Sequence, residues 1–109
     1  MAQATKPLGR SAPAAATPAT LYTAPASTTT IVSSLVICNT NAASDTFRVY
    51  LVPSGGSLNV NNAVYYDVAI TGKNSFSANI VPVLMTGDFI MVWSLNGYCT
   101  FTASGLEIT

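Results

Sequence analysis

The residues of this 109-residue sequence that could take part in catalysis are few and are scattered along the chain. There is no histidine, which excludes Ser-His-Asp and Cys-His arrangements, because both need an imidazole to accept the proton of the nucleophile. Among the four acids only Asp67 and Asp88 are conceivable as a carboxylate pair of the glycosidase type. Asp88 lies in Thr-Gly-Asp, which is typical of a turn leading into a strand, and no glycine-rich phosphate loop occurs. We therefore predict that the protein is not an enzyme and binds no cofactor.

The two cysteines, Cys38 and Cys99, each stand alone in an apolar, strand-like run. Metal sites need clustered cysteine and histidine ligands, so we predict no metal site. Two interpretations of the cysteines remain open. They are either two buried free thiols that pack as small apolar side chains, or one disulfide that joins two sheets.

Four aromatic residues could form a platform for sugar rings on one face of a sheet: Tyr50, Tyr65, Tyr66 and Trp93. The alternative is that Trp93 packs in the core with Phe101, and that the tyrosines bury their rings while their hydroxyls reach solvent. We expect the second arrangement and keep a β-sandwich carbohydrate-binding module as an alternative function.

The composition is apolar and almost uncharged. Half of the residues are hydrophobic and 7% are charged, against roughly 25% charged in an ordinary soluble domain. Ser, Thr and Asn supply the polarity, at 33 of 109 residues. The net charge is zero, which promotes association and suits a chain that works inside an assembly. The four cations are scattered, which argues against nucleic-acid binding. We expect no secretory leader, because no leucine-rich segment follows Lys6 and Arg10, and no apolar run approaches the ~18 residues of a membrane span.

Strand-like segments with turn signals at intervals of about ten residues predict an all-β fold. This spacing favours an antiparallel β-sandwich of about seven strands, jelly-roll or Ig-like. Continuous apolarity over 35–38 predicts a strand buried on both faces, with a bulge at Ser33-Ser34. Pro82 demotes the second half of its strand to an edge or a bulge. The expected strands are 20–24, 28–40, 45–53, 64–71, 75–84 and two more within 87–109.

The last two strands read as a β-hairpin. An apolar run over 89–93 and an alternating run from residue 98 flank Asn96-Gly97. Asn-Gly tolerates the positive φ that a type I′ turn needs at both central residues. The sequence therefore predicts that these two strands pair with each other.

Residues 1–19 are expected to lie apart from the sandwich domain, which we assign to 20–109. Pro7, Pro13 and Pro18 recur every five or six residues and favour an extended, partly polyproline-like conformation. This segment carries a charge of +2 from Lys6 and Arg10, and the remainder carries −2. Two interpretations remain open: a disordered tail, or an arm that becomes ordered on a neighbouring subunit.

Several stretches of the body follow one pattern of strand residues and turns. They are Thr-Leu-Tyr-Thr-Ala-Pro-Ala (20–26), Val-Ser-Ser-Leu-Val-Ile-Cys-Asn-Thr (32–40), Thr-Phe-Arg-Val-Tyr-Leu-Val-Pro (46–53), Tyr-Tyr-Asp-Val-Ala-Ile (65–70), Thr-Gly-Asp (86–88) and the ending Ser-Gly-Leu-Glu-Ile-Thr (104–109). This pattern resembles a group of small all-β structural proteins of tailed bacteriophages. The resemblance covers 20–109 and implies a virion protein, either a capsid decoration (cement) protein or a tail, baseplate or fibre component.

The arm favours the decoration role, because an extended segment that orders on binding can wrap a large surface. We expect a homotrimer that packs through strand 64–71 or loop 57–63, with the arm on a neighbouring subunit or on the capsid. The expected partners are copies of the chain and the major capsid protein or another virion protein, with no nucleic acid and no membrane. The expected location is the virion, after assembly in the cytoplasm of the host bacterium. The predicted interface residues are Lys6, Leu8, Arg10, Leu21, Tyr22, Leu58, Val60, Tyr65 and Tyr66.

Overall fold

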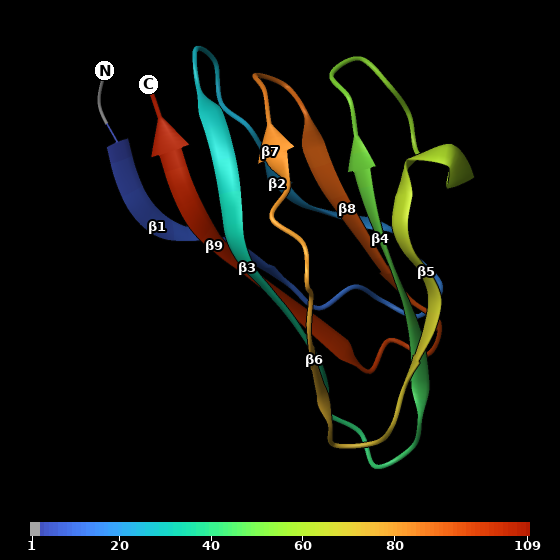
Figure 1. Ribbon diagram of the computed structural model, residues 1–109. Coiled ribbons are helices and arrows are strands. Elements are labelled where there is room, and N and C mark those ends of the chain that lie inside the picture. Colours follow the sequence, from blue (N-terminus) through green and yellow to red (C-terminus); the bar gives the residue numbers. More distant parts are fainter. Residues whose placement is uncertain (1–2) are drawn as a thin grey trace.

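The structure, a computed structural model, describes residues 3–109 and consists of β-strands and one short 3₁₀ helix (Figure 1). None of the described residues forms a helix long and apolar enough to cross a membrane. The elements are β1 (Gln3–Ser11), β2 (Ala19–Thr23), β3 (Thr29–Asn39), β4 (Asp45–Val52), η1 (Val60–Asn62), β5 (Ala63–Ile70), β6 (Ser75–Ser77), β7 (Val83–Leu84), β8 (Phe89–Ser94) and β9 (Cys99–Ile108).

The strands form two antiparallel sheets that pack face to face, as Figure 1 shows. Sheet A has the order β1-β9-β3-β6, and β7 also pairs with β3. Sheet B has the order β2-β8-β4-β5. The predicted antiparallel β-sandwich is confirmed, with nine strands where about seven were expected. One additional strand arises because the predicted strand 75–84 is divided into β6 and β7 by a segment containing Pro82, which has no N–H to donate to a ladder.

The core between the sheets is built by alternation. Phe47 and Val49 of β4, like Ile90 and Val92 of β8, point inward and are fully buried. Phe101 and Ala103 of β9 are also fully buried and face them from sheet A. Because successive strand residues point to opposite faces, the residues in between lie on the outside of each sheet.

The strand β3 differs from its prediction at one point. Leu35 and Ile37 are buried, but Val36 and Cys38 are only half-buried. The prediction of burial on both faces is wrong, because the second face of β3 is the outer surface of sheet A. The predicted bulge is confirmed by a register shift between Val32 and Ser34 in the pairing with β9.

The predicted hairpin at Asn96-Gly97 is wrong. β8 pairs with β2 and β4 in sheet B, whereas β9 pairs with β1 and β3 in sheet A. Gly97 has a φ of 74°, but Asn96 does not adopt a positive φ, so the turn is not of type I′. The chain crosses here from one sheet to the other. This crossing lets the apolar faces of β8 and β9 meet across the core instead of lying side by side.

Residues 3–11, which the sequence analysis assigned to an arm apart from the sandwich, form the edge strand β1 of sheet A. They pair along β9 from Gln3–Ile108 to Ser11–Phe101. Pro7 is compatible with this strand because it lies at a sheet edge, beside a register shift between Pro7 and Gly9. A Cβ on Gly9 would lie 2.2 Å from the carbonyl oxygen of Leu21, so glycine allows β1 to approach β2 closely.

Candidate interaction surface

The crossing between β8 and β9 is organised by the carboxylate of Asp45, the first residue of β4. Its Oδ2 accepts hydrogen bonds from Ser94 Oγ (2.5 Å) and the Tyr98 amide (3.0 Å). Its Oδ1 accepts from the amides of Asn96 (2.9 Å) and Thr46 (2.7 Å). Asp45 is 2% exposed. We call residues 94–98 together with this carboxylate the Asp45 turn.

The Asp45 turn is a structural site. Burial raises the pKa of Asp45, but the hydrogen bonds from Ser94 and from the amides of Asn96, Thr46 and Tyr98 outweigh it, so the pKa lies below its ordinary value of 3.8. The thiol of Cys99 lies 3.5 Å from Asp45 Oδ2. Burial, and then the negative charge of Asp45, raise the pKa of Cys99 to about 12. A thiol that stays protonated and is 1% exposed cannot act as a nucleophile.

Both cysteines are free thiols in the structure. Of the two interpretations left open by the sequence, the free thiols are therefore confirmed. Cys99 is buried, whereas Cys38 is half-buried on the outer face of sheet A.

The outer face of sheet B carries a stacked cluster around Arg48. The guanidinium carbon lies 3.9 Å from the ring centroid of Trp93 and 4.2 Å from that of Tyr66, in cation–π geometry. Arg48 Nε also lies 2.5 Å from Asp67 Oδ1. Asp67 has a φ of 53°, which an aspartate tolerates better than most residues and which accompanies the irregular register of β5. We call Arg48, Tyr66, Asp67 and Trp93 the arginine cluster.

The four aromatic residues do not form an open sugar platform. Tyr65 points into the core, where its ring centroid lies 5.3 Å from that of Phe76, and its hydroxyl accepts from the Asn79 amide at 3.0 Å. Tyr50 is 4% exposed, and Arg48 stacks on Trp93. The expected burial of the tyrosine rings holds for Tyr50 and Tyr65, whereas Tyr66 is 46% exposed. The expectation that Trp93 packs in the core with Phe101 is wrong, because Trp93 lies half-buried on the outer face of sheet B under Arg48.

An apolar surface lies at the β4–β5 connection and the start of β5. Leu58 is 39% exposed, Val60 60% and Val64 40%, and Tyr66 continues this surface. The connection is ordered: Asn59 caps η1 by accepting from the Asn61 amide at 2.9 Å, and Asp88 Oδ1 accepts from the Ser54 amide at 2.9 Å. These side chains are therefore held outward by a defined backbone. We call Leu58, Val60, Val64 and Tyr66 the apolar surface.

The predicted interface residues fall into two groups. Leu58, Val60 and Tyr66 are exposed members of the apolar surface. Val64 was not among the predicted residues, because its place in an alternating strand was no sign of exposure. Tyr65 lies apart from them, on the core side of β5. The other group, near the N-terminus, contacts its own chain through Lys6, Leu8, Leu21 and Tyr22, whereas Arg10 is exposed and lines a pocket.

Lys6 Nζ lies 3.1 Å from Glu107 Oε1. Tyr22 donates to Glu107 Oε2 at 2.5 Å, and its hydroxyl is 2.8 Å from that of Thr30. Burial and the hydrogen bond to Glu107 raise the pKa of Tyr22 to about 12, so the phenol remains a donor. Leu21 is part of the core, and Leu8 packs against it half-buried.

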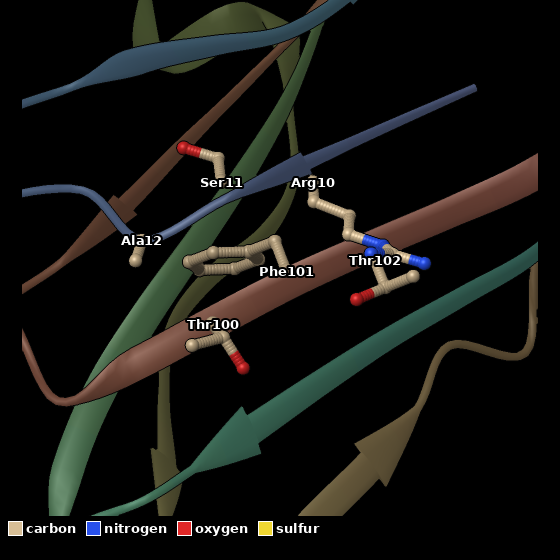
Figure 2. Close-up of a pocket in the computed structure, with 6 residues that line it drawn as sticks. All are labelled: Arg10, Ser11, Ala12, Thr100, Phe101 and Thr102. Carbon is tan, nitrogen blue, oxygen red and sulfur yellow. The ribbon is translucent and has the colours of Figure 1, made fainter. Parts of the chain in front are cut away.

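A pocket of about 350 Å³ lies where β1 separates from β9 (Figure 2). Figure 2 shows the side chain of Arg10 extending over β9 beside Thr102, with the hydroxyl of Thr100 further along that strand. The residues that line the pocket include one cation and three hydroxyl groups, but no carboxylate and no thiol. They lack a general base, so the pocket offers no basis for hydrolysis.

Asp67 and Asp88, the conceivable carboxylate pair, have separate tasks. Asp67 pairs with Arg48. Asp88 accepts from the amides of Ser54 and Met85, each at 2.9 Å, and so closes the turn before β8, as its sequence context suggested. Neither is arranged as a proton donor to a bound substrate.

No protein-family model, curated protein or solved structure matches this chain.

The role of Asp45 was not foreseen, because an aspartate at the start of an alternating strand is typically exposed. With Asp45 buried, Asp67 and Glu107 in ion pairs and Asp88 bound to amides, all four acids serve the fold. The exposed apolar side chains available to a partner are those of the apolar surface and, elsewhere in the described chain, Val81, Val83, Met85 and Leu95.

Proposed function

We propose that this protein is a non-enzymatic structural subunit of a tailed-bacteriophage virion, acting as a capsid decoration protein. Copies of the chain would associate with each other and join neighbouring capsid subunits. The proposal rests on the resemblance of residues 20–109 to phage structural proteins and on the apolar surface, which is the one observation of the structure that carries it.

The apolar surface favours association because little else on the chain opposes it. Each apolar side chain that is fully buried at an interface contributes about 1.5–3 kcal/mol from the hydrophobic effect. Only eight residues are charged, and four of these are paired in two ion pairs within the chain. A partner therefore removes few hydration shells from ions when it covers Leu58 and Val60.

Two alternatives from the sequence remain as outcomes of a test. A tail, baseplate or fibre component would use the same surface at another place in the particle. A carbohydrate-binding module is less well supported, because Arg48 already stacks on Trp93 and Tyr50 is buried. A sugar would have to displace Arg48 to stack there.

Self-association is tested by sedimentation velocity of the full chain. Concentrations from about 5 to about 200 µM cover the micromolar Kd values expected for an interface of moderate affinity. We expect an oligomer. Val60→Asp places a charge in the apolar surface and should raise the dissociation constant of the oligomer at least tenfold. Val81→Asp is the matched control, because Val81 is 64% exposed and lies outside the apolar surface. Equal effects of both variants, or a monomer throughout, would count against the proposal.

A further inference from the structure

We propose that the N-terminal strand is exchanged between copies of this chain, so that residues 3–13 of one copy lie along β9 of a second copy. This inference deepens the assembly role proposed above and rests on it. It identifies the partner of the N-terminal segment as a second copy of the same chain.

The strand β1 is a sheet edge held mainly by its backbone. Among the described strands it pairs with β9 alone, and residues 3–7 are all exposed. Its side-chain anchors are Leu8, half-buried against the core, and Lys6, which pairs with Glu107. Separation of residues 3–13 from their own sandwich would therefore uncover mainly Leu8 and the buried ring of Pro13.

Everything that receives β1 lies in residues 19–109 of the chain. The receiving parts are the edge of β9, the carboxylate of Glu107 and the backbone of Leu21, which passes so close to Gly9 that only glycine fits. A second copy presents the same parts in the same arrangement. An exchanged strand keeps each of these contacts, and only the connecting segment changes conformation.

The connecting segment, residues 14–18, has the properties of a hinge. All five residues are exposed, and the segment lies between buried Pro13 and the start of β2. It turns back through a hydrogen bond from the Thr17 amide to the Ala14 carbonyl (3.1 Å), with Ala16 at a φ of 52°. Alanine is disfavoured in this left-handed region because its Cβ crowds the carbonyl oxygen. Extending the hinge would release that strain.

Two further observations concern the extension of the hinge, residues 14–18. Extension gives up the turn's own bond from Thr17 to Ala14, the bond from the Ala16 amide to the Ser94 carbonyl (2.8 Å) and the close approach of Ala15 to Gly97. Pro18 has a fixed φ that suits an extended chain, and five extended residues span roughly 17 Å. β1 stays paired with β9 up to Ser11, and the chain leaves β9 at Ala12, beside the pocket shown in Figure 2.

The experiment uses two full-length chains that each carry one engineered cysteine. One has Thr5→Cys and the other has Leu106→Cys, because Thr5 and Leu106 are register partners. Both also carry Cys38→Ser and Cys99→Ala, and circular dichroism checks that each is folded. The chains are unfolded together, refolded at 100 µM, oxidised mildly and separated on a non-reducing gel.

We expect a covalent heterodimer, because only an exchanged strand places the engineered thiol of the Thr5→Cys chain beside that of the Leu106→Cys chain. In the control mixture, Thr102→Cys replaces Leu106→Cys. Thr102 is the register partner of Arg10 and not of Thr5, so the disulfide-linked fraction of this mixture should be at least tenfold lower than that of the Thr5→Cys and Leu106→Cys mixture. A chain with Thr5→Cys and Leu106→Cys together reports whether the bond forms at all. If that chain closes as a monomer while the mixture stays unlinked, strand exchange is refuted.

The hinge provides a second, independent measurement. Deleting Ala15 and Ala16 prevents the segment from turning back, so the linked fraction should rise severalfold. Ala16→Gly relieves the strain of the closed turn and should lower it. A linked fraction that falls on deletion of Ala15 and Ala16 and rises in Ala16→Gly would overturn the proposal.

Failure of this inference is distinct from failure of the proposed function. An oligomer that is sensitive to Val60→Asp but forms no heterodimer refutes exchange and leaves the assembly role standing. If heterodimers form but Val60→Asp does not change the association of the chain, exchange is confirmed and the apolar surface is not the interface of the assembly.

Discussion

The two ends of the sandwich differ in how they use polar and apolar side chains. At the end formed by loops 40–44, 71–74 and 95–98, polar side chains are buried and hydrogen-bonded: Asn39 donates to the carbonyls of Ala43, Ile70 and Thr71, and Asp45 holds the turn to β9. At the end formed by loops 53–62 and 85–88, at the top of Figure 1, apolar side chains are exposed, among them Val60 and Met85. We call these the polar end and the apolar end.

This difference separates folding from association. A buried polar group that loses its partner costs free energy in the folded chain, so the polar end is expected to determine stability. An exposed valine contributes little to folding and gains only when a partner covers it. Substitutions at the two ends should therefore affect different measurements.

The largest effect is expected for Asp45→Ala. It leaves the amides of Asn96 and Tyr98 and the hydroxyl of Ser94 without their acceptor, and we expect a loss of about 3 kcal/mol in the free energy of unfolding. Asp88→Ala at the apolar end is the matched control, because Asp88 accepts two amides from a half-exposed position. It should cost about 1 kcal/mol. Urea unfolding followed by Trp93 fluorescence measures both, and equal losses would remove the distinction between the ends.

The dependence of stability on pH follows from the same carboxylate. The pKa of Asp45 is depressed in the folded chain, and so is that of Glu107, through hydrogen bonds from Tyr22 and Lys6. A depressed pKa contributes stability that is present above the unfolded values, ordinarily 3.8 and 4.5, and is lost as pH falls through the folded values.

Stability should therefore stay level from about pH 7 to 5 and fall below about pH 4. Asp45→Asn should flatten that fall relative to the unsubstituted chain. Urea midpoints at several pH values measure both chains. A midpoint that rises on acidification would contradict the assignment.

A smaller effect is expected for Arg48→Ala in the arginine cluster. The cluster is partly exposed, so losing the stacks on Trp93 and Tyr66 and the pair with Asp67 should cost only about 1 kcal/mol. The emission of Trp93 should shift to longer wavelength as water reaches the indole. Arg48→Lys keeps the charge without the planar stack, so its stability and its Trp93 emission should lie between those of Arg48→Ala and the unsubstituted chain. An unchanged spectrum in Arg48→Ala would mean that the stack does not form in solution.

Local pattern predicted much of the fold and little of its topology. The spacing of strand-like segments and turns predicted the antiparallel sandwich, and Ser33-Ser34 marked a bulge. The placement of β8 and β9 in different sheets was missed because Asn-Gly favours a hairpin locally, while the buried carboxylate of Asp45, distant in sequence, fixes a crossing. The strand β1 was missed because prolines argue against a strand unless it lies at an edge.

The candidate surface was predicted in part for the same reason. Leu58 and Val60 stood in a loop whose composition suggested exposure, and both are exposed. Tyr65 and Tyr66 could not be told apart, since which of two adjacent residues faces the core depends on the register of β5 against β4.

The most direct test of the decoration role is immunogold electron microscopy of purified virions with an antibody against this chain. If this chain is a decoration protein, each virion head should carry many gold labels over its outer surface. Label confined to the tail, or virions without label, would contradict it.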